Sequence, residues 1–416
     1  MKNHFKVFNT LMLAIALVSC SSDDGSGIDN ANKLIISAST TDVAVGDPIT
    51  FEVTLNGDPV PESEIYINGE SVVGPEHTFL DKGSYNIVAK MAGSLDSEEL
   101  TVSVYKVDVY VAGREHNGAQ YQAKYWTNGI ETVLTNGDQD ARAQSVFVSE
   151  NVVYVAGIEF DGSNNVAKYW RNGTEILLTN DGLTANANSV FVSDGDVYVA
   201  GSENSSIASM AKYWKNGKEI MLTDGSQAAQ TSSIFVSGED VYVAGNEKNG
   251  SKYVAKYWKN GAEIVLTDGA QQAYAESIVV SGGIVHVAGR ENNGSYNVAK
   301  YWKNNVGVAL TDGSQPSIAN AVFVSGEDVY VAGHESNGSN YVVKYWKNGD
   351  EVVLTDGSQN AYATSLFVLG DDVYISGYEE SGLNFVAKYW KNGEEIVLTD
   401  GNQRASARSI YVAKSY

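Results

Sequence analysis

Seven glutamates that recur at an interval of 44 residues are the first candidates for chemistry in this sequence. Each stands two residues after a Val-Ala-Gly triplet or its equivalent, and the set is Glu115, Glu159, Glu203, Glu247, Glu291, Glu335 and Glu379. Paired carboxylates act as acid and base when their environments differ, because only then do their pKa values separate. Seven equivalent copies lack that asymmetry. The pattern therefore favours a hydrogen bond or an ion pair within each repeat over a cation site or an acid–base pair.

No other familiar catalytic pattern occurs in the sequence. The histidines lack the spacing of a zinc-binding HExxH motif, and there is neither a Gly-x-Ser-x-Gly elbow nor a phosphate-binding glycine loop. These histidines are His4, His77, His116, His286 and His334. The sequence therefore predicts a protein that is not an enzyme and that has no metal site and no cofactor.

Two positions vary within an otherwise nearly constant repeat, and such positions are the candidates for ligand recognition. The first lies in an Ala-x-Ala-x-Ser pattern and holds Arg142, Asn186, Gln230, Tyr274, Ile318, Tyr362 and Ser406. The second precedes each recurring glutamate and holds Arg114, Ile158, Ser202, Asn246, Arg290, His334 and Tyr378. The one acid among the variable residues of the Ala-x-Ala-x-Ser pattern is Glu276. Neutral drift on exposed loops is the alternative explanation for this variation.

The spacing of the tryptophans defines the repeat, and the repeat indicates which strands position these residues. All seven tryptophans are spaced 44 residues apart: Trp126, Trp170, Trp214, Trp258, Trp302, Trp346 and Trp390. Each repeat offers four short strands, as in residues 233–271, where SIFVS, DVYVAG, YVAKYW and EIVLTDG follow one another. Asn260-Gly261 and Gly238-Glu239 suit tight hairpin turns, because asparagine and glycine accept positive φ. Such a repeat is typical of a four-stranded propeller blade.

The repeat region begins and ends in the middle of a four-stranded unit, which predicts a closed ring. The chain enters at a second strand, Asp108–Gly113, and ends after a first strand, Ser409–Ala413. Pairing these two segments completes one blade from both chain ends and removes two exposed edges. We therefore predict an all-β protein with a seven-bladed β-propeller over residues 107–416. The near-identical KYWKNGxEIxLTDG segments resemble repetitive propellers of bacterial surface proteins, a likeness of fold and not of activity.

Ring closure also brings charged residues together. Of the six arginines, Arg114, Arg142, Arg404 and Arg408 are expected on one sector of the face that carries the longer loops. Arginine suits carboxylate or sulfate groups, so this face is predicted to bind an anionic ligand such as an acidic glycan or a peptide carboxylate. Tyr274 and Tyr362, expected on other sectors, could stack on sugar rings, and His334 and Tyr378 complete the candidate site. The alternative is that the arginines offset nearby acids such as Glu115 and Asp140.

Residues 33–106 predict a separate small β-domain. Alternating segments such as ITFEVTL (Ile49–Leu55) and YNIVA (Tyr85–Ala89) are separated by glycine, proline, asparagine and aspartate, which is typical of a β-sandwich. The order of its turn and strand residues, from Gly46-Asp47 through Asn68-Gly69 to Ser84-Tyr85, resembles Ig-like or PKD-like domains. The expected role of this domain is that of a spacer.

The first 32 residues predict a targeting signal, a lipid anchor and a tether. Residues 1–19 have a basic start and a short apolar run, LMLAIALV, typical of a signal peptide and too short to span a bilayer as a helix. Leu17-Val18-Ser19-Cys20 resembles the lipobox of bacterial lipoproteins, which implies lipid on Cys20. Residues 20–32 form a polar tether, and Ser22-Asp23-Asp24 resembles the export signal of Bacteroidota surface lipoproteins. The resemblance implies an outward-facing protein anchored in the outer membrane by lipid alone.

Charge excludes one class of partner. With 28 basic and 51 acidic residues the net charge is −23, which argues against nucleic acid, whose phosphates need a basic surface. We therefore predict a monomeric surface protein that recognises an extracellular glycan, peptide or protein without catalysis. The alternatives are a polysaccharide hydrolase or lyase, which would need a unique pair of acids, and a purely structural adhesion module.

Overall fold

Antiparallel β-strands make up the computed structural model, which describes residues 32–179 and 182–416. The expectation of an all-β protein is confirmed for this part of the chain. The predicted signal peptide, Cys20 and the tether up to residue 31 lie outside the described residues. The described residues divide into two compact units, one formed by residues 32–107 with 414–416 and the other by residues 108–413.

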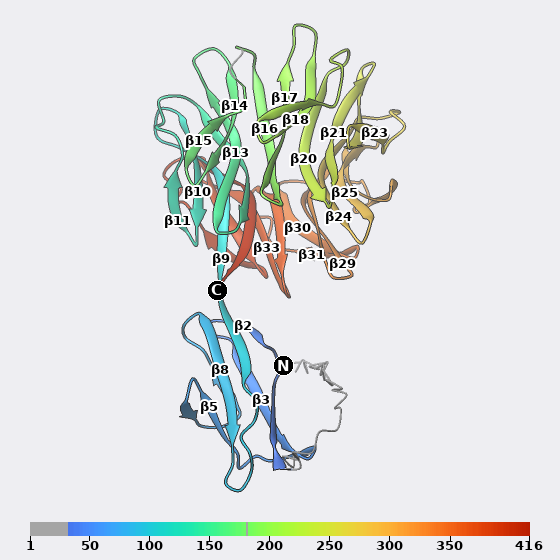
Figure 1. Cartoon of the computed structure of the whole chain (residues 1–416). Coiled ribbons are helices and arrows are strands. Elements are labelled where there is room, and N and C mark those ends of the chain that lie inside the picture. Colours follow the sequence, from blue (N-terminus) through green and yellow to red (C-terminus); the bar gives the residue numbers. More distant parts are fainter. Residues whose placement is uncertain (1–31, 180–181) are drawn as a thin grey trace. The chain divides into compact units, whose positions relative to one another are not determined.

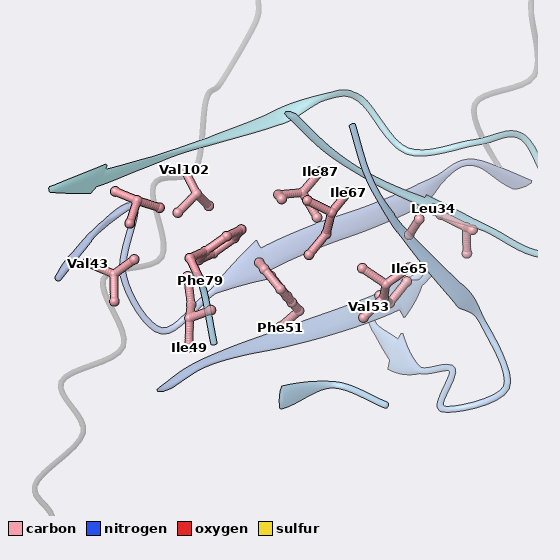
Figure 2. Close-up of a cluster of buried hydrophobic side chains, with 12 residues drawn as sticks. Leu34, Val43, Ile49, Phe51, Val53, Ile65, Ile67, Phe79, Ile87 and Val102 are labelled. Carbon is pink, nitrogen blue, oxygen red and sulfur yellow. The ribbon is translucent and has the colours of Figure 1, made fainter. Parts of the chain in front are cut away.

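The first unit contains two sheets that share one apolar core. One sheet has the order β1-β3-β4, with β7 paired to β3, and the other contains β5, β6, β8 and β9, with β2 parallel to β9. Their bounds are β1 Leu34–Ala38, β2 Asp42–Ala44, β3 Pro48–Leu55, β4 Asp58–Pro59, β5 Glu64–Ile67, β6 Glu70–Val72, β7 Glu76–Thr78, β8 Gly83–Lys90 and β9 Leu100–His116. Figure 2 shows Phe51, Ile87 and Val102 from both sheets in this core. Along β3 buried and exposed residues alternate, as the sequence predicted.

The second unit is a succession of four-stranded antiparallel sheets, a propeller-like arrangement (Figure 1). Within each sheet the strands pair in sequence order. The first three complete sheets are β12 Ala141–Ser149, β13 Val152–Phe160, β14 Asn165–Arg171, β15 Thr174–Leu177; β16 Ala185–Ser193, β17 Asp196–Asn204, β18 Ser209–Lys215, β19 Lys218–Met221; and β20 Ala229–Ser237, β21 Asp240–Asn249, β22 Lys252–Lys259, β23 Ala262–Val265. The next three are β24 Ala273–Ser281, β25 Ile284–Asn292, β26 Asn297–Lys303, β27 Val306–Ala309; β28 Ser317–Ser325, β29 Asp328–Ser336, β30 Tyr341–Lys347, β31 Asp350–Val353; and β32 Ala361–Leu369, β33 Asp372–Ser381, β34 Asn384–Lys391, β35 Glu394–Val397.

The chain ends complete one further sheet of the same kind. β36, Ala405–Ser415, pairs with β9, which pairs with β10, Tyr121–Thr127, and β10 with β11, Ile130–Val133. We call this the closing sheet. The expected pairing of the segments around Tyr110 and Ile410 is therefore confirmed.

The first strands of neighbouring sheets contact one another through two rows of side chains. In one row, Tyr411 of β36 packs against Phe147 of β12 and Phe367 of β32, with ring centroids 4.8 and 4.9 Å apart. In the other, a serine hydroxyl accepts a hydrogen bond from the next first strand, as Ser409 does from the Val146 amide at 3.1 Å. The equivalent serines are Ser145, Ser189, Ser233 and Ser277. The last sheet and the first are thus linked through the closing sheet.

The recurring tryptophans pack between neighbouring sheets. Trp170 of β14 is fully buried against Ala112 and Ala123 of the closing sheet, and its equivalents are buried in the same way. An aromatic ring of this size removes a large apolar area from water. The expected structural role of the Lys-Tyr-Trp triplet is therefore confirmed for its tryptophan.

The hairpin turns form at the residues that the sequence predicted, whereas the first strands are longer than predicted. Asn260 and Gly261 have φ of 50° and 83°, and Gly238 has φ of 59°, as tight primed hairpin turns require. The first strands, however, begin four residues earlier than SIFVS and its equivalents predicted, at Ala141 instead of Ser145 in β12. A β-bulge between Ala143 and Ser145 allows this extension, because it absorbs one extra residue.

The serine row yields a matched pair of stability predictions. Ser409→Ala removes the acceptor for the Val146 amide and should lower the free energy of unfolding by about 1 kcal/mol. Ala321 stands at the position where the other first strands have serine, so Ala321→Ser should raise stability by a similar amount. Denaturant unfolding measures both, and Ser237→Ala, at an exposed strand end, is the control. Equal effects of Ser409→Ala and the control would contradict the role of the row.

Candidate functional site

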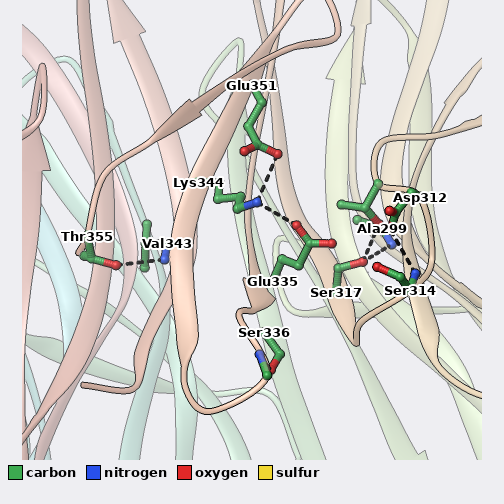
Figure 3. A network of polar contacts seen from close by, with 12 residues as sticks. Ala299, Asp312, Ser314, Ser317, Glu335, Ser336, Val343, Lys344, Glu351 and Thr355 are labelled. Carbon is green, nitrogen blue, oxygen red and sulfur yellow. Dashed lines mark hydrogen bonds and ion pairs between the residues drawn. The ribbon is translucent and has the colours of Figure 1, made fainter. Parts of the chain in front are cut away.

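The constant charged residues of the repeat are paired with one another. In each sheet the lysine of Lys-Tyr-Trp forms an ion pair with the recurring glutamate, as between Lys344 and Glu335 at 2.6 Å, and in six sheets also with a second glutamate such as Glu351 (Figure 3). The other pairs join Lys124, Lys168, Lys212, Lys256, Lys300 and Lys388 to their recurring glutamates. The expected structural role of the seven glutamates is confirmed, because each carboxylate already has a cationic partner.

The bulge brings two variable positions together. The residue inside the bulge, which we call the bulge position, is Gln144 in β12 and Glu276 in β24. The residue before the recurring glutamate, which we call the second-strand position, lies on the neighbouring strand. Across β24 and β25 these positions hold Glu276 and Arg290, whose Oε1 and Nη1 are 2.6 Å apart. Across β28 and β29 they hold Asn320 and His334, whose Nδ2 and Nδ1 are 3.3 Å apart.

Glu276 forms an ion pair with Arg290, and no second carboxylate takes part in this contact. The Arg290 guanidinium also lies 4.4 Å from the centroid of the Tyr274 ring. A glycosidase needs two carboxylates flanking the bond that breaks. The one acid that the sequence offered for the enzyme alternative is therefore held in an ion pair.

The closing sheet has arginine at both positions. By the repeat of 44 residues, Arg408 of β36 occupies the bulge position and Arg114 of β9 the second-strand position. Arg142 of the neighbouring β12 joins them, and we call these three residues the arginine cluster. Burial, followed by the positive charges of Arg408 and Arg142, lowers the pKa of Arg114 from its usual value to about 10. Like charges thus meet where the sheet of β24 has an ion pair.

Nearby acids do not neutralise the cluster. Glu115 is paired with Lys124 at 2.7 Å, and Asp140 accepts a hydrogen bond from the Tyr121 amide at 3.0 Å. Within residues 32–179 and 182–416, the arginine that forms a salt bridge is Arg290. The alternative in which Glu115 and Asp140 offset the arginines therefore lacks its contacts.

Three buried polar atoms of the closing sheet have no hydrogen-bond partner in the described part of the chain. They are Nε of Arg114, Nε of Arg408 and Oγ of Ser406. Ser406 is 5% exposed and lies two residues from Arg408 on β36. Buried polar atoms are normally paired with protein, water or ligand. Nε of Arg290 is also unpartnered although Arg290 has an acidic partner, so it is the buried Ser406 hydroxyl that marks the arginine cluster as a place where a partner can be added.

Aromatic rings hold the guanidinium groups in place. Arg114 lies 4.2 Å from the ring centroid of Tyr121, and Arg408 lies 5.4 Å from that of Tyr378. Arg404 is exposed and lies 4.6 Å from the ring centroid of Phe385. Such contacts fix a long side chain while its N–H groups stay available.

The predicted aromatic residues continue from the cluster along neighbouring sheets. Tyr362 stacks on Tyr378 with centroids 5.0 Å apart, and His334 meets Tyr362 edge-on at 5.1 Å. Tyr362, expected on a sector apart from the arginines, thus lies next to the ring that covers Arg408. Tyr274 packs on Arg290 and Tyr253 instead, away from these contacts. Tyr362 and Tyr274 are therefore half-buried against protein groups.

Sequence reasoning named Arg408, Glu276 and Ser406 as variable candidates, but it missed that the bulge position and the second-strand position lie side by side. Aligning the fourth residue of every Ala-x-Ala-x-Ser segment gives Gln144, Asn188, Ser232, Glu276, Asn320, Thr364 and Arg408. That alignment would have placed Arg408 at the same position as Glu276, but it would not have revealed the bulge that brings this position next to the second-strand position. Tyr121 and Phe385 carried no signal beyond their aromatic character.

Neither a metal cluster nor a spanning helix is found in the described residues. Within them, no three or more His, Cys, Asp and Glu side chains are grouped so that they could hold a metal ion. The same residues contain no helix with the length and apolar character needed to cross a membrane.

Comparisons with known proteins give distant likenesses of structure. No protein-family model matches the chain, and no curated protein matches it. TolB from Acinetobacter baumannii is 12% identical with a TM-score of 0.41, covering 80% of each chain. An auxiliary nutrient binding protein from Bacteroides thetaiotaomicron is 9% identical with a TM-score of 0.37, covering 93% of this chain and 99% of that one. Trypanosoma rangeli sialidase is 10% identical with a TM-score of 0.34, covering 65% of this chain and 54% of the other. At such TM-scores the likenesses do not decide between binding and catalysis.

Buried His334 makes stability depend on pH. Burial first, and then the charge of Arg290, lower the pKa of His334 from 6.5 to about 4, and the rings of Tyr341 and Tyr362 pack against it. Because the folded pKa lies below the unfolded value, the unfolded chain takes up the proton first as pH falls. Stability is therefore lost between pH 6.5 and pH 4.

His334→Asn tests this dependence, since asparagine occupies the equivalent position 246. Between pH 7 and pH 5 the wild-type protein should lose about 2 kcal/mol more than the variant, from the shift in the pKa of His334. Urea unfolding at the two pH values measures the difference. Identical pH dependence in the two proteins would show that His334 is not the titrating group.

Proposed function

We propose that this chain is a surface lipoprotein of the bacterial outer membrane that binds an extracellular anionic ligand without catalysis. In this proposal the second unit is a closed seven-bladed β-propeller and residues 33–106 are an Ig-like spacer. The binding face is the end of the sheets where the first strands begin and the second strands end. The ligand is a glycan, a peptide or a protein that presents acidic groups.

One observation carries the proposal: the arginine cluster is positively charged, partly buried and without an acidic partner. Burying like charges costs free energy that an anion offsets. In a chain of net charge −23, acids were available to pair with these arginines, yet Glu115 is paired with Lys124. The cluster is therefore better suited to an external anion than to the fold.

Ring closure is supported by three contacts of β36. Tyr411 packs against both Phe147 and Phe367, and Ser409 accepts a hydrogen bond from Val146 of β12. Closure leaves no unpaired first strand in the second unit. That arrangement favours a seven-bladed ring over an open stack, which would need polar caps at its ends.

The two alternatives are less well supported. A hydrolase or lyase needs two acids in unlike environments, whereas Glu276 is paired with Arg290. A purely structural module would show scattered variation on exposed loops. Here the charges of Arg408 and Arg142 lower the pKa of Arg114, so three of the variable residues are gathered in space.

Binding is tested with polymers that differ in charge. The chain lacking residues 1–20 should bind an acidic polysaccharide such as polygalacturonate or heparin and not neutral dextran. Arg142→Ala should weaken this binding tenfold or more, which corresponds to about 1.4 kcal/mol. Arg171→Ala is the matched control, because Arg171 lies outside the cluster on Tyr154. Equal loss in both variants, or equal binding of dextran, would contradict the proposal.

The proposed lipid anchoring and surface location are tested separately, starting from Cys20. Cys20→Ala should abolish incorporation of labelled fatty acid and release the protein from the membrane fraction, since two acyl chains hold a protein stably on a bilayer. Ser21→Ala should leave both unchanged. Protease added to intact cells should cleave the wild-type chain if it faces outward; full protection would contradict outward exposure.

A further inference from the structure

The sheets of the second unit offer an internal comparison for the arginine cluster. The bulge and second-strand positions hold Glu276 and Arg290 in one sheet, where the two side chains neutralise each other. The same positions hold Arg408 and Arg114 in the closing sheet. Because the backbone frame is repeated, the difference lies in the side chains. The closing sheet thus has a site built like an internal ion pair, with the acid missing.

The polar atoms without partners indicate which kind of ligand would take the place of that acid. Ser406 Oγ is a hydroxyl without a partner, although Ser406 is 5% exposed, and Arg114 Nε and Arg408 Nε, like Nε of the ion-paired Arg290, are donors without acceptors. Ser406, Arg114 and Arg408 belong to two paired strands, β9 and β36. Arg142 adds a third guanidinium from the adjacent sheet. Each of these groups can donate a hydrogen bond to an oxyanion.

The number and origin of the donors select among anions. A carboxylate has two oxygens in one plane, which a single arginine fork already satisfies. Here three guanidinium groups come from β9, β12 and β36, with a hydroxyl beside them. The three terminal oxygens of a pyramidal group point in three directions and can accept from donors on three strands, whereas the lone pairs of a carboxylate lie in one plane.

Building on the proposed function, we propose that the arginine cluster with Ser406 binds the terminal XO3 group of a sulfate ester or a phosphate monoester. The stacked rings of Tyr121 and Tyr378 hold the guanidinium groups of Arg114 and Arg408 in position beforehand. Preorganised donors lose little freedom when the anion arrives. Tyr378, Tyr362 and Phe385 then adjoin the part of the ligand that carries the ester.

Small anions provide the first test. Thermal unfolding and titration calorimetry are carried out on the chain lacking residues 1–20 with sodium sulfate, phosphate or acetate, at constant ionic strength set by chloride. Sulfate or phosphate should raise Tm and bind at least tenfold more tightly than acetate. A sulfated and a phosphorylated monosaccharide are then compared, and the one that binds with higher affinity shows whether the ligand is a sulfate ester or a phosphate ester.

Arg408→Glu is the decisive variant, because it rebuilds the Glu276–Arg290 pair in the closing sheet. It should fold, show a higher Tm than wild type in chloride, and lose at least tenfold in sulfate or phosphate affinity. Ser406→Ala should fold normally and weaken binding about fivefold, as expected for one lost hydrogen bond. Arg171→Ala, outside the cluster, should bind as wild type.

The outcomes separate this inference from the proposed function. If acetate and acidic polymers that carry carboxylates alone bind as tightly as sulfate, and Arg408→Glu abolishes this binding, the XO3 assignment is wrong while anion recognition stands. If no anion binds, or if Arg408→Glu leaves affinity unchanged, both are wrong. A higher Tm of Arg408→Glu together with lost sulfate binding supports the assignment.

Discussion

The pairing of β36 with β9 is the constraint on which the second unit depends. Without it β9 would present an unpaired edge and the first strands would lack a link between Phe147 and Phe367, which Tyr411 supplies. The same pairing creates the candidate site, because it brings Arg408 of β36 near Arg114 of β9. The link between the sheets and the proposed recognition thus rest on the same backbone contact, and a site at this place needs no special loop.

Repetition separates the residues that hold the frame from those that could recognise a ligand. Lysines of the repeat are neutralised by one or two glutamates, and the tryptophans are buried between sheets. One sheet shows how much the frame tolerates: Gly307 replaces the second glutamate, and Lys300 keeps a single pair with Glu291 at 3.0 Å. Its side chain is then 23% exposed, against 6% for Lys168, which has two partners.

Much of this architecture could be predicted from the sequence because period and turn residues are local signals. The spacing of tryptophans gave the number of repeats, and Asn-Gly pairs gave the hairpins. The bulge between Ala143 and Ser145 could not be predicted, since it depends on how two strands pair and not on residue type. For that reason the convergence of Arg114, Arg142 and Arg408 was predictable, while the contact between the bulge position and the second-strand position and the unpartnered Ser406 Oγ were not.

The division of labour between lysine and arginine follows from their chemistry. Lysine is a compact point charge that two carboxylates satisfy, and the repeat uses it inside each sheet. Arginine keeps its charge under burial and carries donors along a planar fork, so it can remain positive next to a second arginine where a lysine would more readily lose its proton. Arg114 retains its charge at neutral pH although its pKa is lowered to about 10. A protein with an excess of acids can keep a cationic site only if the acids next to that site are engaged elsewhere. Glu115, which follows Arg114 in the chain, meets this condition because it is bound to Lys124.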